Sequence, residues 1–145
     1  MEDKRLDTEN EKLLVLKDVK TSFFTKKGVV RAVDGVSFSI SKGEVVGLVG
    51  ESGCGKSITS LSIMRLVPQP AGKIVSGEIL FKNEDLLKKS EDEMRRIRGD
   101  RISMILQDPM VSMNQLLRVG YQIGEPYRYH HVCGIFVKPR IPPNL

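Results

Sequence analysis

The sequence is poor in the features that mark several protein classes. It has two cysteines, Cys54 and Cys133, which are far apart and too few for a disulfide framework or a metal site. A reducing cytoplasm therefore suits the chain best. No apolar run approaches the roughly 18 residues that cross a bilayer, and residues 1–10 are charged, without the apolar stretch of a secretory signal. We expect no transmembrane segment and no secretion.

The composition is that of a soluble globular protein. The chain has 145 residues, enough for one domain or part of one, with 40% hydrophobic and 28% charged residues. Its net charge is +5, which can indicate nucleic acid or an anionic membrane as a partner. Acidic residues are interspersed, however, and aromatic residues do not alternate with basic ones, so we expect no nucleic-acid partner. For Arg95, Arg96 and Arg98 a solvated face is favoured over a partner-binding patch.

One stretch indicates a specific chemistry because it fits the pattern G-x-x-x-x-G-K-S/T at every fixed position. An apolar, β-branched run at 45–49 precedes it and predicts a buried strand. The residues at 57–67 follow with apolar side chains at helical spacing, and Pro68 ends the predicted helix. Strand, glycine-rich loop and helix are the context of a phosphate-binding loop. The stretch itself is Gly50, Glu51, Ser52, Gly53, Cys54, Gly55, Lys56 and Ser57.

These residue types suit phosphate binding. The glycines allow a tight loop whose N–H groups point inward, and the helix adds the positive end of its dipole. Lys56 can reach the β- and γ-phosphates, and the Ser57 hydroxyl can bind Mg²⁺. The alternative, a glycine-rich turn with a stray lysine, fits the full pattern less well. The loop alone does not choose between ATP and GTP, or between a kinase and a transport ATPase.

The flanking patterns predict an α/β fold, a P-loop core with an antiparallel β subdomain. Strands are expected at 13–19, 29–33, 36–40, 74–81 and 102–106, with extended chain at 21–24 and turns at 26–28, 34–35, 41–44 and 82–85. Asp34-Gly35 is expected to be a hairpin turn. Ser90 and Glu93 predict the capped start of a short helix that runs to Arg98, with Gly99 as its stop. The strand at 102–106 is expected to be buried.

With these segments in order, the chain resembles the nucleotide-binding subunit of ATP-binding-cassette (ABC) transporters. Within that family it is most similar to the importer ATPases for dipeptides and oligopeptides, or for nickel. The similarity covers about residues 13–128. Ser112 and Asn114 favour the peptide-importer branch, whereas Met113 and Gln115 depart from its usual leucine and proline. The segments that carry the resemblance are 31–38, 43–44, 47–57, 76–79, 97–99 and 104–110, the last containing Gln107, Asp108 and Pro109.

The resemblance implies ATP and Mg²⁺ as cofactors. It places Phe23 where the family stacks an aromatic ring on adenine, although a core phenylalanine fits equally well. It adds Ile58 to the nucleotide contacts of the loop. Gln107 matches the glutamine that helps to ligate Mg²⁺ and couples the site to the membrane subunit, so Ser57 and Gln107 are the expected metal ligands.

The resemblance also implies partners. Complete members pair with a second ATPase subunit and dock on membrane-spanning permease subunits, at the cytoplasmic face of the cell membrane. The expected function is ATP binding that energises import of peptides or nickel. The alternatives are a nucleotide-binding module without transport activity and a non-functional truncated product.

The resemblance ends near Tyr129. The sequence contains no Leu-Ser-Gly-Gly-Gln signature, no apolar strand ending in Asp-Glu and no later switch histidine. We therefore expect a polar segment at 1–12, a partial ATP-binding domain at 13–128 and a divergent, non-helical tail at 129–145. Such a truncated chain is expected to bind ATP but to hydrolyse it poorly.

His130, His131 and Cys133 are too closely spaced for a full zinc site. Cys54 is either a reactive thiol or a small residue that fits the loop, and the second is favoured.

Overall fold

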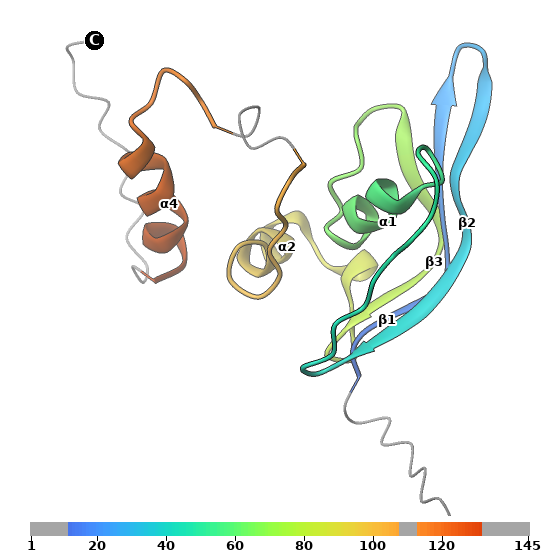
Figure 1. Ribbon diagram of the computed structural model, residues 1–145, viewed down its shortest axis with the longest axis horizontal. Helices are drawn as coiled ribbons and strands as arrows, with labels where there is room; N and C mark the ends of the chain where they lie inside the picture. Colours follow the sequence, from blue (N-terminus) through green and yellow to red (C-terminus); the bar gives the residue numbers. More distant parts are fainter. Residues whose placement is uncertain (1–11, 108–112, 132–145) are drawn as a thin grey trace, which may run out of the picture. The chain divides into compact units, whose positions relative to one another are not determined.

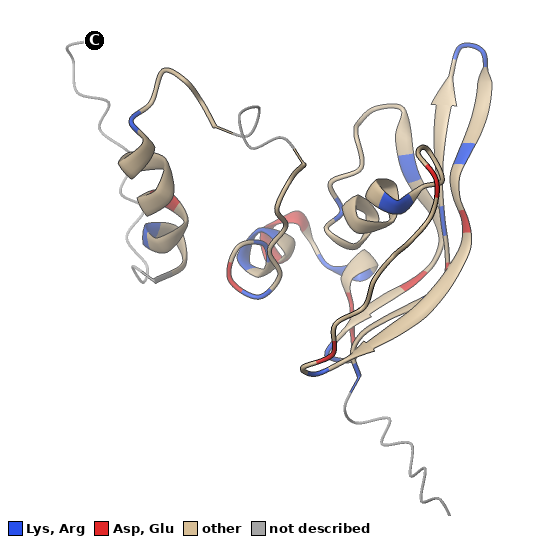
Figure 2. Ribbon diagram, viewed as in Figure 1, with Lys and Arg blue, Asp and Glu red and all other residues tan. Residues whose placement is uncertain are grey.

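The computed structural model describes residues 12–107 and 113–131, and the chain divides after Ser90 into two units (Figure 1). In its described part the first unit is an antiparallel sheet with one short α-helix. Its strand order is β2-β1-β3-β4. Acidic and basic residues are interspersed along the ribbons, as the sequence analysis predicted (Figure 2).

Strands β1 (Lys12–Thr25) and β2 (Gly28–Ser41) form a long hairpin. Both are rich in β-branched and aromatic residues, which favour extended backbone. The predicted turn is confirmed at Lys26 and Lys27, where Thr25 pairs with Gly28 across a two-residue connection. The Thr25 hydroxyl donates to the Gly28 carbonyl at 2.8 Å and closes the turn.

The predicted turn at Asp34-Gly35 is wrong. The two expected strands on either side are one continuous strand, β2, and Gly35 is an extra residue at φ +81° where the pairing with β1 shifts register between Val36 and Asp34. A glycine at positive φ within a ladder is a β-bulge, which bends the strand without reversing it. The turn signal was local, whereas pairing with β1 on both sides of Gly35 keeps the chain extended.

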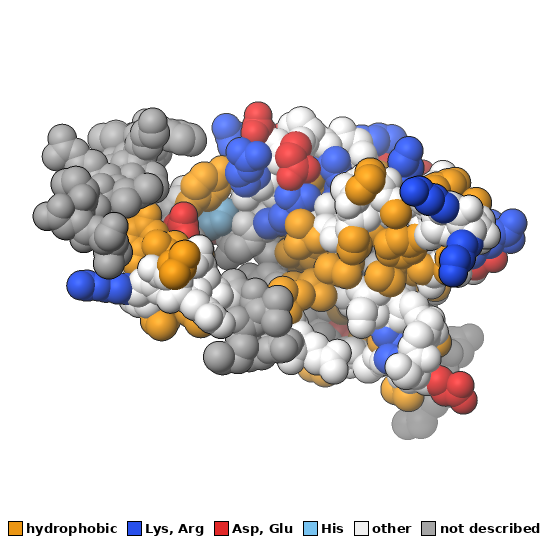
Figure 3. Space-filling view, turned by 90° about the horizontal axis from the view of Figure 1, so that it is seen from above, with side chains coloured by type: hydrophobic (Ala, Val, Ile, Leu, Met, Phe, Trp, Pro, Cys, Tyr) orange, Lys and Arg blue, Asp and Glu red, His pale blue; other side chains and the backbone are white. Residues whose placement is uncertain are grey.

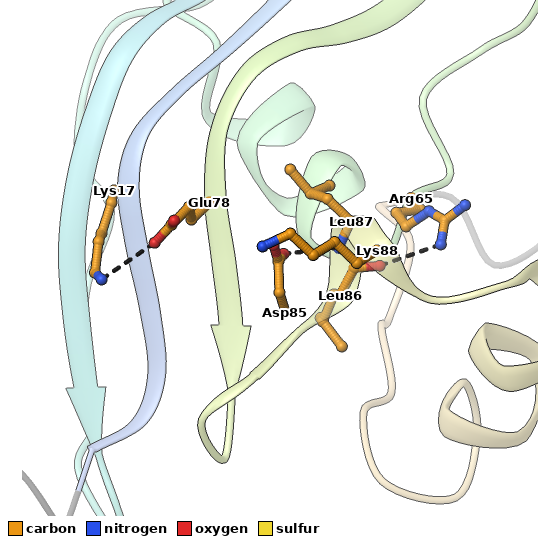
Figure 4. Close-up of polar contacts among 7 residues, drawn as sticks. All are labelled: Lys17, Arg65, Glu78, Asp85, Leu86, Leu87 and Lys88. Carbon is orange, nitrogen blue, oxygen red and sulfur yellow. Dashed lines mark hydrogen bonds and ion pairs between the residues drawn. The ribbon is translucent and has the colours of Figure 1, made fainter.

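Strand β3 (Gly72–Phe81) pairs with β1 on the side away from β2. A two-residue turn at Lys82 and Asn83, both at positive φ, confirms the first half of the turn predicted at 82–85, whereas Glu84–Asp85 form the short strand β4, which was not predicted. The 3-10 helix η2 (Leu86–Lys88) follows, and the Asp85 carboxylate accepts from the Leu87 N–H at 3.0 Å (Figure 4).

Helix α1 (Lys56–Ile63) lies against β1 and β2. It is shorter than predicted because Arg65, at φ +52°, ends it with bonds from the Arg65 N–H to the Ser62 carbonyl and from the Leu66 N–H to the Leu61 carbonyl. The core of this unit is mainly apolar and lies between the sheet, α1 and η2. Its buried members are Leu16, Val19, Val33, Met64, Val67, Ile79, Phe81 and Leu86.

The predicted buried strands at 45–49 and 102–106 are wrong. Neither segment belongs to a strand in the described residues, apart from a single bridge of Ile102 to Arg98. Val45 is 97% exposed, Val49 93% and Ile105 96%. An apolar run forms a strand only beside a partner strand, and the described chain supplies none for either segment. Figure 3 shows hydrophobic side chains at the surface of each unit.

The second unit contains α2 (Glu91–Ile97) and α4 (Val119–His131). Helix α2 follows Ser90 and ends before Gly99 at φ +89°, as predicted. The expectation of a non-helical tail from Tyr129 is wrong for its first residues, since α4 continues to His131; the rest of the tail lies outside the described residues. In the described part of the chain, no helix has the length and apolarity to cross a membrane.

Candidate functional site: the phosphate loop

The loop Gly50–Ser57 lies in the first unit, after a segment outside any helix or strand, and its last two residues begin α1. Gly55 is the N-cap of α1, with φ 93° and ψ 0°. Its carbonyl accepts from the Thr59 N–H at 2.8 Å and from the Thr59 hydroxyl at 3.0 Å. The N–H groups of the first helical turn have no partner within the helix, so this end of α1 favours an anion.

Gly55 also fixes the loop against the sheet. A Cβ at this position would lie 2.3 Å from the Ala32 carbonyl oxygen of β2, closer than any real contact. The positive φ adds a second reason for glycine, because L side chains rarely adopt it. Gly55 therefore allows the loop backbone to lie close to β2, and its approach to a bound phosphate remains a prediction.

Lys56 folds its ammonium group into the loop. Its Nζ donates to the Gly50 carbonyl at 2.7 Å and to the Glu51 carbonyl at 2.5 Å, and lies 3.4 Å from the Cys54 sulfur. The loop is closed further by the Cys54 N–H, which donates to the Glu51 carbonyl at 3.4 Å. A positive charge at the centre of the loop and the N-terminus of α1 next to it make this place electropositive.

The remaining loop residues are accessible. Ser52, Gly53, Cys54 and Ser57 are exposed, and Ile58 is half-buried. Ser57 belongs to the first turn of α1, next to Lys56, so its hydroxyl can reach a cation that accompanies a phosphate. Its role as a Mg²⁺ ligand remains a prediction.

Phe23 is half-buried on β1. A Cβ at Gly72 would lie 2.9 Å from its ring carbon Cε1 and 2.5 Å from Val67 Cγ1, so the ring edge packs close to β3 and to the chain after α1. This contact suits the alternative of a core phenylalanine. Stacking of the ring on adenine remains a prediction.

Gln107 lies in the second unit, exposed and outside any helix or strand. Its predicted role as a metal ligand also remains a prediction. Among the described residues, no group of three or more His, Cys, Asp and Glu side chains could hold a metal ion. Cys133 and the side chain of His131 lie outside the described part, as do Asp108, Pro109 and Ser112.

The sequence analysis missed three polar residues that hold α1 in place. Thr21 of β1 and Ser62 of α1 are fully buried and lie 2.8 Å apart, hydroxyl to hydroxyl. The Arg65 guanidinium donates to the Leu86 carbonyl at 3.1 Å and to the Lys89 carbonyl at 2.5 Å. The only signal in the sequence was the surplus of serine and threonine on a helix that needs one apolar face.

The sequence is similar to proteins of peptide transport. The family profile described as "ABC transporter" matches residues 33–127. The "Dipeptide transport ATP-binding protein DppD" of Bacillus subtilis (strain 168) is 54% identical over 120 residues, 83% of this chain and 36% of its own length. The "Probable peptide ABC transporter ATP-binding protein y4tR" of Sinorhizobium fredii is 50% identical over 118 residues, 81% of this chain and 35% of its own.

The fold has a relative among solved structures. A structure titled as the dimeric, post-hydrolysis state of the ATP-binding cassette MJ0796 bound to ADP and Pi aligns with a TM-score of 0.71 and 25% identity. The alignment covers 84% of this chain and 50% of that one. This chain thus spans about a third of the curated relatives' length and half of the solved cassette. The α/β P-loop fold is confirmed, and the chain belongs to the ABC transporter family.

Proposed function

We propose that the chain binds ATP, as its Mg²⁺ complex, at the loop Gly50–Ser57. The observation that supports this most strongly is the Lys56 ammonium held inside the loop by the Gly50 and Glu51 carbonyls, at the N-terminus of α1. Relatives named as ATP-binding proteins at 50% and 54% identity, and a similar cassette bound to ADP and Pi, favour ATP over GTP.

Phosphate binding requires little rearrangement of Lys56. An ammonium group has three N–H donors, and two already point at backbone carbonyls that define the loop. The third contact, at 3.4 Å to the Cys54 sulfur, is to a weak acceptor. A phosphate oxygen forms a shorter, charge-assisted bond, so we expect it to replace the sulfur contact.

We further propose that this binding serves import of peptides. The relatives' names support that substrate class, with nickel as the less supported alternative. In this proposal the chain acts at the cytoplasmic face of the membrane with permease subunits and a second ATPase subunit. Phe23 would contact the adenine, and Ser57 with Gln107 would ligate Mg²⁺, which neutralises charge on the phosphates.

Hydrolysis by this chain alone is expected to be slow. Cleavage needs a positioned water and charge stabilisation around the γ-phosphate, and the 145 residues contain neither the signature sequence nor the Asp-Glu strand expected for this role. Phosphate release by the purified chain, measured beside MgATP binding, separates the cases. Binding without phosphate release supports the nucleotide-binding module, and turnover supports the ATPase. If the chain shows no binding and no release, the non-functional product is supported.

The transport proposal has its own test. The chain is co-expressed with the permease subunits of a dipeptide importer, and the membranes are washed and probed for it. Retention that the Gln107→Ala variant loses supports the docking role of Gln107. A chain found wholly in the wash contradicts the proposed partners.

A further inference from the structure

The contact between α1 and β1 is polar at its centre. Thr21 and Ser62 are both 0% exposed, and their hydroxyl oxygens are 2.8 Å apart. The Ser62 hydroxyl also lies 2.7 Å from the Ile58 carbonyl, one turn back in α1, and donates to it. A hydroxyl has one proton, so Thr21 donates to Ser62 and Ser62 donates to Ile58.

These two consecutive hydrogen bonds restrict the rotation of α1 and its position along β1 more tightly than an apolar contact would. Apolar side chains can slide past one another with small changes in energy, whereas a buried hydroxyl that loses its partner incurs the full desolvation cost. The pair therefore holds α1 at one rotation about its axis and one position along β1. Both residues are fully buried in a core that also contains apolar residues such as Val19 and Ile79.

The second contact of α1 lies at its other end, over the neighbouring strand. At the N-cap, Gly55 is so close to Ala32 of β2 that no Cβ fits, and a Cβ there would lie 3.8 Å from Val33 Cγ2. Val33 is also the residue that pairs with Thr21 across β1 and β2. Gly55 thus lies against Ala32, the residue before the Val33 that pairs with Thr21, so the two ends of α1, at Ser62 and at Gly55, lie over neighbouring positions of β1 and β2.

Two contacts on one rigid pair of strands define the direction of a short helix. We propose that Thr21 and Ser62 are positioning residues for the phosphate site: their hydrogen bond sets the orientation of α1 and so directs its first-turn N–H groups and Lys56 at the phosphates. The inference rests on the proposed ATP binding and adds two residues that do not touch the nucleotide. Misplacing binding groups by about 1 Å is enough to weaken a site of this kind.

The test compares MgATP affinity in isosteric variants. Thr21→Val keeps shape and removes the donor, Ser62→Ala removes the acceptor, and Thr21→Ser restores the hydroxyl. The apparent Kd rises as the fraction of chains with α1 in the binding orientation falls, so a fall of that fraction to about one fifth gives about a fivefold higher Kd. We expect that rise in Thr21→Val and Ser62→Ala, no further rise in the double variant, and a Kd within about twofold of wild type in Thr21→Ser.

The matched control is Thr25→Val, which removes a hydroxyl bonded to the Gly28 carbonyl in the hairpin turn, away from α1. It should bind MgATP as the wild type does. Melting of each variant with and without nucleotide separates lost affinity from lost folding, since a purely structural change lowers the melting temperature and leaves the Kd of the folded protein unchanged. Should Thr21→Val fail to fold, Thr21→Cys keeps the size with a weaker donor, and a rise in Kd of about twofold is expected.

Amide hydrogen exchange tests the orientation of α1 without nucleotide, so it does not depend on the proposed ATP binding. The Thr59 N–H, bonded to the Gly55 carbonyl at 2.8 Å, should exchange faster in Thr21→Val than in wild type without any nucleotide. If the wild type binds no ATP, the proposed function fails while this readout still tests the orientation of α1. Unchanged exchange, or an unchanged Kd in folded Thr21→Val and Ser62→Ala, would overturn the inference.

Discussion

Replacing Arg65 by methionine should destabilise the first unit more than any change at an exposed arginine. Arg65 directly follows α1, is half-buried, and its guanidinium donates to the carbonyls of Leu86 and Lys89 at 3.1 and 2.5 Å (Figure 4 shows the first). Leu86 is 0% exposed, so water cannot replace the lost donor at that residue without opening the core. Methionine keeps most of the apolar stem and removes only the charged donors.

The expected cost follows from the two bonds. A hydrogen bond to a charged group contributes about 1.5–3 kcal/mol, and the second of a pair contributes less because the groups are not independent. We therefore expect Arg65→Met to lower the free energy of unfolding by about 3 kcal/mol. Arg65→Gly loses the same bonds but relieves the positive φ of +52°, so its cost should be smaller by about 1 kcal/mol.

Urea unfolding followed by circular dichroism measures both variants. The matched control is Arg95→Met on α2, whose pair with Asp92 at 3.6 Å is largely exposed and should contribute less than about 1 kcal/mol. A loss in Arg65→Met no larger than in the control would refute the role of the guanidinium. A loss in Arg65→Gly larger than in Arg65→Met would refute the account of the backbone.

Three further predictions follow from the loop and the exposed segment before it. Gly55→Ala should abolish ATP binding and lower stability by about 2 kcal/mol or more, because its Cβ would clash at 2.3 Å, whereas Gly47→Ala, with nothing within 4 Å, should be neutral by thermal melting. Val45 and Val49 are 97% and 93% exposed, so we expect the wild type to self-associate in analytical ultracentrifugation and the Val45→Lys, Val49→Lys double variant to do so less; a monomeric wild type, or an unchanged profile in the variant, would count against this. Alkylation of Cys54 should block nucleotide binding and ATP should protect the thiol, and full affinity after complete modification would contradict that prediction.

Local features of this chain were predictable from its sequence. The loop, the start of α1 and the turns at 26–27 and 82–83 depend on residues a few positions apart, and all were predicted correctly. Turn-forming residues and the glycines of the loop carry most of the information for these structures within a few positions of one another.

Features that depend on distant partners were not predictable. The apolar runs at 45–49 and 102–106 have the pattern of buried strands, but a strand exists only where another strand pairs with it. At Gly35 the local turn signal was overruled by pairing with β1, which is separated from it in sequence. The hydrophobic pattern of a segment shows which side chains are apolar, but it does not show which other segment will pack against them.

The polar contacts around α1 could not be predicted from the sequence either. Nothing in the sequence brings Thr21 to Ser62 or Arg65 to Leu86, because these pairs are 41 and 21 residues apart. Serine and threonine are mostly exposed in proteins, so the surplus of these residues on α1 was too weak a signal to identify Ser62 as buried. Such residues are found only once the sheet and the helix are in place.

The central claim is that the loop binds nucleotide through Lys56. Isothermal titration of MgATP into the chain, with Lys56→Ala and the hairpin control Lys27→Ala, tests it most directly. We predict binding by the wild type and by Lys27→Ala, and a Kd at least about tenfold higher in Lys56→Ala, since a charge-assisted bond to phosphate contributes more than about 1.4 kcal/mol. No binding by the folded wild type, or equal binding by Lys56→Ala, would contradict the account.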